Sequence, residues 1–389
     1  MHTKKPSLVD QLRGATKLAV DATQNVTEIV KQMHHTIGGG PEVLGKPLEK
    51  VTKLLSAPTY ATIRGVTKLV GAGLDLALQQ LEPLLERAGS ERGMVLAALN
   101  GVLGDYLEET GNPLAIEMQL RVAGVAVTEK FPPGTRLLVM VHGSSMEDLQ
   151  WLRKGHDHGP ALAKAHGFVP VYLRYNSGLH VSENGRRFSA LLESWASEVD
   201  EVVLLAHSMG GLVSRAACHT AEEAGHGWRK KLSALITLGT PHHGAPLERG
   251  GNWVDVLLGV SRYSAPLVKL GQLRSAGVTD LRYGNVLDAH WQGRDRFAHE
   301  GDPRGELSLP AGVKCYAIAA SLGSGRGDGL VPVDSALGVH AERSLGFPDA
   351  HRWTVRPASH LDLLDHPEVF AKLLEWLSPS PLRGEGVTS

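Results

Sequence analysis

The sequence predicts an α/β fold in which helices cover both faces of a mostly parallel sheet. Short runs of apolar residues recur from residue 137 onward, and they lack the polar alternation of a strand that faces water. Segments with the 3.6-residue periodicity of a helix lie between these runs. A glycine-containing turn, residues 206–211, joins one apolar run directly to the next helix.

Six apolar runs are expected to form the sheet. A helix between successive strands supplies the crossover that a parallel pair needs, so the alternation of the two patterns indicates parallel pairing. The expected strands cover residues 137–141, 169–173, 201–205, 235–239, 313–318 and 353–355, and the expected helices cover residues 186–197, 209–224 and 366–377.

Residues 1–110 differ in texture from the rest, because apolar and small residues recur there at steps of three and four. An apolar helix face has to be buried, either within the protein, on a membrane or lipid surface, or against a partner protein. We therefore expect an N-terminal helical region (residues 1–110) before a catalytic domain (residues 111–389) with a cap at about residues 247–310. The helices expected in the N-terminal region lie near residues 8–33, 63–84 and 91–108.

The composition narrows the function classes. The chain has 389 residues, of which 42% are hydrophobic, so it can build a sizeable core. Lys and Arg number 40 and Asp and Glu 41, and the resulting net charge of -1 excludes a strongly basic nucleic-acid binder. Cys218 and Cys315 are too few for a disulfide framework or a four-thiolate metal site, and their apolar flanks predict buried, reduced thiols.

The first residues carry two lysines without an apolar run behind them, which is not the pattern of a secretory signal. No stretch reaches the roughly 18 consecutive apolar residues that span a bilayer. From these two observations we expect a cytoplasmic protein.

Ser208 is the candidate nucleophile. It stands in the sequence Ala-His-Ser-Met-Gly, between an expected strand and an expected helix. A turn this tight needs small residues two positions before and after the serine, and Ala206 and Gly210 supply them. The turn would lift the hydroxyl above the sheet and place the Met209 amide at a helix N-terminus, beside a developing oxyanion. The pattern therefore favours a catalytic serine over an ordinary helix cap.

A serine nucleophile needs a histidine base and a carboxylate that orients the base. In the chain order Ser, acid, His, the acid follows a late strand and the histidine follows the last strand. Asp328 stands in a glycine-rich loop at the first place, and His360 stands in Ser-His-Leu-Asp at the second. Asp334 is a rival acid in the same loop, and His366 is a rival base at the expected start of the final helix.

The other half of an oxyanion hole is expected after the strand 137–141. Gly143 permits a close approach of the chain there, and the amide of Ser144 could bind the oxyanion together with that of Met209. His142 is expected to be a structural hydrogen-bonding residue beside the substrate. The residues that we expect to contact the substrate are His142, Gly143, His207 and His243.

Five segments carry a resemblance to a known family. They are VHGSS (141–145), AHSMGG (206–211), LGTPHHGAP (238–246), GDGLVP (327–332) and SHLDLL (359–364). Together they resemble the serine lipases and esterases of the α/β-hydrolase superfamily, in particular bacterial lipases and the hydrolases that are similar to GPI inositol-deacylases. The resemblance implies the α/β-hydrolase fold with a cap insertion. Ala206 and Ser144 depart from it, since glycine and an apolar residue are common at these places.

In the lipases that the chain resembles, segment 238–246 begins the lid, which implies that His242 and His243 line the acyl site. Packing of this loop on the sheet is the alternative for both histidines. Residues 253–260 are apolar and would suit a lid over an acyl chain. Some bacterial lipases hold calcium near the catalytic histidine, where this chain has Asp362, but the hydrolysis requires no metal and we expect no cofactor.

The resulting expectation is a serine hydrolase that cleaves carboxylic esters, of a small molecule or a lipid, through an acyl-enzyme. Acyl transfer to an alcohol would use the same triad, and a hydrolase scaffold could also be reused for binding alone. The helices of residues 1–110 would offer contacts to a membrane surface or to a partner protein.

Overall fold

The structure, a computed structural model, describes residues 92–195, 198–245, 275–294, 302, 304–305, 307–323 and 327–378. The chain divides into two compact units, and all described residues except Arg92–Leu96 belong to the unit formed by Ala97–Leu257 and Arg274–Ser389. The helices predicted near residues 8–33 and 63–84 and the apolar segment 253–260 lie outside the described residues.

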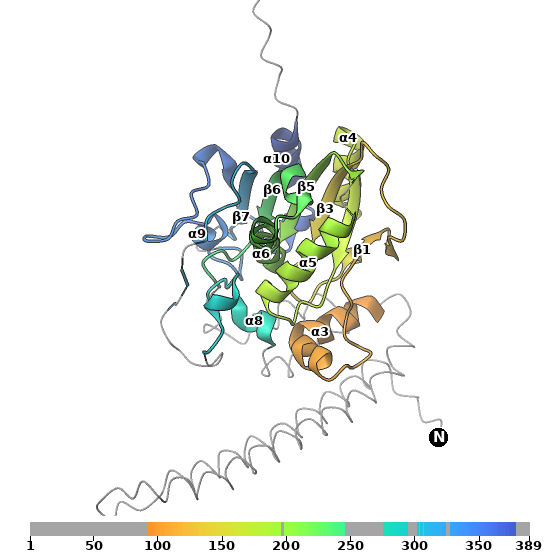
Figure 1. The fold of residues 1–389 in the computed structure, drawn as a ribbon. Coiled ribbons are helices and arrows are strands. Elements are labelled where there is room, and N and C mark those ends of the chain that lie inside the picture. Colours follow the sequence, from red (N-terminus) through yellow and green to blue (C-terminus); the bar gives the residue numbers. More distant parts are fainter. Residues whose placement is uncertain are drawn as a thin grey trace, which may run out of the picture. The chain divides into compact units, whose positions relative to one another are not determined.

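Within the described residues, one sheet of eight strands forms the centre of the fold (Figure 1), in the order β2-β1-β4-β3-β5-β6-β7-β8. The strands from β3 to β8 pair in parallel, whereas β1 pairs antiparallel with both β2 and β4. The prediction of a mostly parallel sheet is therefore confirmed. The strands are β1 Gln119–Val122, β2 Val125–Ala126, β3 Arg136–Val141, β4 Val169–Arg174, β5 Glu201–His207, β6 Leu232–Leu238, β7 Lys314–Ala320 and β8 Arg352–Val355.

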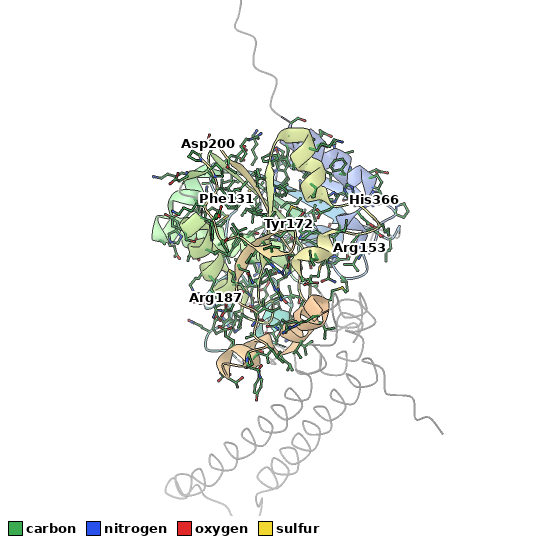
Figure 2. All side chains as sticks on the ribbon, turned by 90° about the vertical axis from the view of Figure 1, so that its right-hand side faces the viewer. Phe131, Arg153, Tyr172, Arg187, Asp200 and His366 are labelled. Atoms are coloured by element: carbon green, nitrogen blue, oxygen red, sulfur yellow. The ribbon has the colours of Figure 1, made fainter. Side chains whose placement is uncertain are left out.

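Helices cover both faces of this sheet. Figure 2 views the sheet from its edge, with Arg187 of α5 on one side, His366 at the start of α10 on the other, and Tyr172 of β4 between them. Helices α5 and α6 pack on each other on the first side, and α4 and α10 are in contact on the second. The helices are α3 Arg92–Glu109, α4 His158–His166, α5 Val181–Trp195, α6 Met209–Ala224, α8 Ala276–Asp280, α9 Val333–Ala336 and α10 Pro367–Leu377.

Two hydrophobic clusters, one on each face, explain why the strands read as continuous apolar runs. In β3, Leu137 and Val139 belong to the cluster beneath α5 and α6. The residue between them, Leu138, belongs to the cluster beneath α4 and α10. All three side chains are fully buried. Because successive side chains point to opposite faces, a strand covered on both faces must be apolar at every position.

The helix predicted over residues 209–224 is α6, with the same bounds, and the one over 366–377 is α10. The helix predicted over 186–197 begins five residues earlier, at Val181, because the Val181 N–H donates to the Asp280 carboxylate at 2.9 Å. A cap that comes from so far along the chain has no local sequence signal. The antiparallel hairpin β1–β2 and the helix α4 were not among the expected elements.

The helix predicted over 91–108 is α3, and its second half packs closely on the loops at the carboxyl edge of the sheet. A Cβ at Gly101 would lie 1.9 Å from Ser145 Oγ, so only glycine fits this approach. The backbone carbonyl of Gly101 accepts a hydrogen bond from Ser275 Oγ at 2.6 Å, which joins α3 to the segment that begins α8. Residues 97–109 therefore fold as part of the sheet-containing unit.

Both cysteines are buried and free, as predicted. Burial raises the pKa of the Cys218 thiol to about 12, so it stays protonated and unreactive at neutral pH. Among the helices that the structure describes, none combines the length and the apolar character needed to cross a membrane.

Gly185 is expected to set the distance between α5 and α6, because a Cβ there would lie 2.3 Å from the Cβ of Ala216. Alanine normally stabilises a helix by about 1 kcal/mol relative to glycine. We predict the opposite sign for Gly185→Ala: a free energy of unfolding lowered by about 1–3 kcal/mol, through overpacking. Urea unfolding measures this, with Ser194→Ala on the exposed side of α5 as the control. An unchanged or increased stability of the glycine variant would contradict the prediction.

Candidate active site

The turn between β5 and α6 carries Ser208 in a backbone conformation that is rare for any residue with a side chain, with φ 55° and ψ -125°. The turn is anchored to the sheet, since the Ser208 N–H donates to the Leu238 carbonyl of the neighbouring strand at 2.8 Å. Strain of this kind persists only where the surroundings hold it, and it is concentrated at functional sites.

Gly210 is the second requirement of this turn. A Cβ at this position would lie 2.4 Å from the Val141 carbonyl oxygen and 2.6 Å from the His142 carbonyl oxygen. Any larger residue would therefore push α6 away from the end of β3. Strands β3 and β5 are neighbours, but β3 leads along the chain to β4 on its other side, so the serine stands where the strand order reverses. Open α/β sheets bind their ligands at this point.

Asp328 and His360 form a buried pair. His360 Nδ1 lies 2.7 Å from Asp328 Oδ2, and both side chains are almost completely buried. The other oxygen of the carboxylate, Oδ1, accepts the N–H groups of Leu330 and Val331 at 2.9 and 2.7 Å. Three donors thus hold the carboxylate in place, and the carboxylate in turn leaves His360 Nε2 as the free nitrogen of the ring.

The turn after β6 contacts both the His360 ring and the turn that carries Ser208. The ring of His360 lies against the turn after β6, where a Cβ at Gly239 would be 3.1 Å from His360 Nδ1. Gly239 follows Leu238, the residue that binds the Ser208 amide. Ser208 Oγ and His360 Nε2 are both buried, and neither has a hydrogen-bond partner among the described residues. The Ser208–His360 hydrogen bond itself is therefore not formed in this structure.

The loop after β3 lies directly beside the serine. A Cβ at Gly143 would be 3.0 Å from the Cβ of Ser208. Ser144 follows and is completely buried. Within the described part of the chain, neither the Ser144 N–H nor the Met209 N–H at the start of α6 is engaged in a hydrogen bond. Two amides beside one buried hydroxyl are suited to binding an oxyanion.

His142 fixes the orientation of this loop. Its Nδ1 lies 2.8 Å from the Gly143 carbonyl oxygen, and its ring stacks on Tyr175 with 4.3 Å between centroids. Burial lowers the pKa of His142 to about 4, so the ring is neutral and Nδ1 can be the donor. Because the C=O and N–H of a trans peptide point in opposite directions, the bond to the Gly143 carbonyl also directs the Ser144 N–H.

A family model described as PGAP1-like alpha/beta domain matches residues 181–300, a stretch that contains β5, Ser208 and α6. This match agrees with the strand order of the sheet and with the tight strand-to-helix turn at Ser208. The protein has an α/β-hydrolase fold. No curated protein matches the chain.

Solved structures that are similar to this chain include three lipases and esterases. The mature Bacillus licheniformis lipase BlEst2 has a TM-score of 0.41 and 17% identity, over 66% of this chain and 98% of that one. Aspergillus fumigatus lipase B has a TM-score of 0.40 and 14% identity, over 63% of this chain and about half (53%) of that one. The naproxen esterase from Bacillus subtilis has a TM-score of 0.38 and 13% identity, over 64% and 86% of the two chains.

The fold places both rival residues, Asp334 and His366, outside the buried pair that Asp328 and His360 form. Asp334 lies in α9 and is exposed, in contrast to the buried Asp328. His366 caps the first turn of α10, where its side chain accepts a hydrogen bond from the Glu368 N–H. Of the two acids and two histidines considered, only Asp328 and His360 form a hydrogen-bonded pair.

His207 is hydrogen-bonded to the backbone of the loop that carries His360. Its Nε2 lies 3.1 Å from the His360 carbonyl oxygen, and the two ring centroids are 4.7 Å apart. Complete burial, helped by the nearby His360, holds the pKa of His207 well below its usual range. The neutral ring therefore donates from Nε2 to the carbonyl and orients the loop that carries His360.

His242 and His243 are hydrogen-bonded to residues other than Asp328 and His360. His242 Nε2 lies 3.3 Å from Thr237 Oγ1 of β6, and its ring packs on Phe347 at 5.4 Å. Both histidines line a cavity with Arg215 and other basic residues, and neither Ser208 nor His360 lines that cavity. The contact with the substrate that is expected of His243 stays a prediction.

Asp362, considered as a calcium ligand, holds the turn beside His360. Its Oδ2 accepts the N–H and the hydroxyl of Ser359 at 2.9 and 2.6 Å. Its Oδ1 lies 3.3 Å from Lys154 Nζ. In the described parts of the chain, no group of three or more His, Cys, Asp or Glu side chains is arranged to hold a metal ion.

Two residues of the site were missed at the level of sequence. The Tyr175 hydroxyl donates to the His142 carbonyl at 2.8 Å, and Ser177 Oγ accepts the Ser145 N–H at 2.9 Å. Both residues follow β4, and they fix the loop of residues 142–145 that follows β3. The only sequence signal is their place after an expected strand, which many residues share.

We predict that the free energy of unfolding of the protein decreases as the pH falls from about 6.5 to 4. Unfolded histidine has a pKa near 6.5, whereas burial lowers the pKa of both His142 and His158 to about 4. The unfolded state therefore binds more protons in this range, and the loss approaches about 3 kcal/mol for each histidine at its lower end. Urea unfolding at several pH values measures this. In His142→Gln the fall should be smaller, and an equally steep fall would contradict the assignment.

Proposed function

We propose that this hydrolase cleaves carboxylic esters through a covalent acyl-enzyme, with Ser208 as nucleophile, His360 as base and Asp328 as the orienting acid. The observation that carries the proposal is the 2.7 Å bond between the buried His360 and Asp328 side chains, next to a strained turn that presents a serine. A nucleophile, a base and an orienting acid are the parts that acyl transfer by a serine requires.

In the first step, Ser208 Oγ attacks the ester carbonyl carbon while His360 Nε2 takes the hydroxyl proton. This requires the two atoms to come within about 3 Å of each other. Because both atoms lack hydrogen-bond partners among the described residues, a rotation of the Ser208 side chain toward the ring breaks no such bond. Hydrogen bonds of this kind are often long in free enzymes and tighten when the substrate binds.

The tetrahedral intermediate carries its negative charge on the former carbonyl oxygen. The N–H groups of Ser144 and Met209 are the proposed donors, and the loss of one such donor costs on the order of 3 kcal/mol of transition-state stabilisation. His360 then gives its proton to the leaving alcohol as the bond between carbon and alcohol oxygen breaks. Water, activated by the same histidine, releases the acid from Ser208.

Substrates with a lipid-like acyl chain fit this proposal best. Residues 253–260 are mostly apolar in sequence, which is the observation that favours a lipid-like acyl chain. Acyl transfer to an alcohol would follow the same steps with the alcohol in place of water. Product analysis after adding an alcohol acceptor separates the two reactions, because transfer yields a new ester and hydrolysis yields the free acid.

We predict that Ser208→Ala abolishes both ester hydrolysis and covalent labelling by a fluorophosphonate probe. The proposed loss is at least about 10³-fold in kcat, because the nucleophile is removed. The measurements are hydrolysis of short and long p-nitrophenyl esters and the mass of the labelled protein. A folded Ser208→Ala protein that kept full activity would end the proposal.

Ser214→Ala is the matched control for this variant. Ser214 is also a buried serine of α6, but its hydroxyl already donates to the Gly210 carbonyl at 2.8 Å. It should therefore remain labelled and active. Lack of labelling in the unchanged protein would instead favour a scaffold that only binds.

A second prediction separates the two candidate acids. Asp328→Asn should lower kcat by about 10⁴-fold, because an amide favours the wrong histidine tautomer. Asp334→Asn should leave kcat unchanged, because its exposed carboxylate lies outside the pair. Steady-state kinetics on one ester decide this, and the reverse ranking would move the acid to Asp334.

A further inference from the structure

A second cluster of chemically active side chains surrounds a cavity of about 70 Å³. The cavity lies beside α6, between the segment that follows α8 and the loop that follows α9, elements whose positions Figure 1 shows. Neither Ser208 nor His360 lines it. The basic residues that line it are Arg215, Arg304, Arg343, His242, His243 and His290.

Arg215 is the most unusual of these residues, because it is an arginine in the core with 4% exposure. One nitrogen of its guanidinium, Nη2, donates to the Leu307 carbonyl at 2.7 Å. Its Nε is buried without a hydrogen-bond partner, and no carboxylate of the described residues forms an ion pair with it. A buried charge without a counter-ion costs several kcal/mol, so a site that keeps one needs a reason.

Burial and the neighbouring Arg304 lower the pKa of Arg215 to about 10, so the group is still charged at neutral pH. Arg304 and Arg343 share one carboxylate, that of Asp302, at 2.7 and 3.0 Å. Three guanidinium groups thus line the cavity, and this carboxylate pairs with two of the three. The described residues leave the site with an excess of positive charge.

The histidines add donors and acceptors but no charge. Burial lowers the pKa of His243 and of His290 to about 4. His242 is buried with its Nδ1 unpartnered among the described residues. A bound anion would favour the protonated form of these rings and would gain further hydrogen bonds from them.

The size of the cavity and its opening suit a small ligand. A single water needs on the order of 10–15 Å³ by the same measure, so the cavity holds a group of about five heavy atoms. The floor is made of buried residues, Arg215 and His242, whereas Gly305, Ser308 and Ser344 at its edge are exposed. Solvent therefore reaches the cavity, and no carboxylate of the described residues pairs with the buried Arg215 in it.

We propose that this cavity is a binding site for a phosphate group. Phosphate has five heavy atoms and a negative charge, and guanidinium groups bind its oxygens with paired, charge-assisted hydrogen bonds. A phosphate here would supply the counter-ion that the described residues do not give Arg215. Arg215 lies in α6 seven residues after Ser208, which separates the two backbone positions by about 10 Å along the helix axis. Because neither Ser208 nor His360 lines the cavity, we treat it as a site of its own.

A purely structural role accounts for only part of the cluster. Arg304 Nη1 donates to the carbonyls of His242 and Gly284 at 2.9 and 3.2 Å, and so ties two loops together. Such a role explains Arg304, whose charge Asp302 also balances. It does not explain Arg215, since one neutral donor to the Leu307 carbonyl would suffice there and would avoid the cost of a buried charge.

Calorimetric titration of the whole protein with inorganic phosphate tests the proposal, with sodium chloride at equal ionic strength to remove screening effects. We expect saturable binding with a dissociation constant of about 1 mM or tighter. Arg215→Met should weaken binding at least about tenfold. Arg136→Gln is the control. Arg136 stands at the start of β3, pairs with Glu201 and does not line the cavity.

Absence of saturable binding, or equal binding by folded Arg215→Met and the unchanged protein, would overturn the proposal. Circular dichroism shows whether the variant folds, and replacing a buried charge by an apolar side chain of similar length is often tolerated. If Arg215→Met does not fold, Arg343→Gln gives an independent answer, because the Arg343 side chain is partly exposed. Its binding of phosphate should be several-fold weaker, and unchanged binding would count against the site.

Two further arms distinguish the source of the phosphate. Glycerol 3-phosphate in the calorimeter represents a soluble phosphate ester. Co-sedimentation with phosphatidylcholine vesicles, with and without phosphatidic acid, represents a lipid headgroup. Binding that depends on Arg215 in either arm supports the site and identifies its source. Because no arm measures ester hydrolysis, failure of the phosphate site and failure of the proposed catalytic function can be told apart.

Discussion

The whole site depends on one steric constraint, the close approach of the turn after β5 to the end of β3. Ser208 can keep a positive φ there because its amide is bound by Leu238 and because Gly210 leaves room for the carbonyls of β3. Strain of this kind costs on the order of 1–3 kcal/mol. The apolar cores on both faces of the sheet hold the strands and α6 in place and offset that cost.

Buried polar contacts then transmit this geometry to the other loops. The loop after β3 is fixed by His142 and by Tyr175, and the loop that carries His360 is fixed by His207 and by Asp328. Three of these contacts join a side chain to a backbone carbonyl, and the fourth joins the Asp328 carboxylate to the His360 ring. Neutral histidines suit this role because a ring that stays uncharged can be buried at low cost while it still donates one hydrogen bond. The same core also holds a charged residue, Arg215, which serves none of these contacts.

Much of the fold could be predicted because its signals are local. A strand that is buried on both faces is apolar throughout, as in β3 and β5, and α6 begins directly at the serine turn. The beginning of α5 could not be predicted, because its cap is Asp280, 99 residues away. The hairpin β1–β2 was missed because its strands have four and two residues, too few to show a period. The packing of Gly101 on Ser145 also has no local signal.

By itself, the sequence determined the type of fold, the place of the candidate nucleophile and the two loops in which its partners had to be found. It could do so because tight turns and buried strands restrict the residue types that they accept. Only the tertiary structure shows that Asp328 is buried and hydrogen-bonded to His360 whereas Asp334 is exposed, since residue type alone does not distinguish two aspartates that are close in the sequence. It alone gathered Arg215, Arg304 and Arg343 at one cavity, because each comes from a different segment and their common charge appears only when those segments meet.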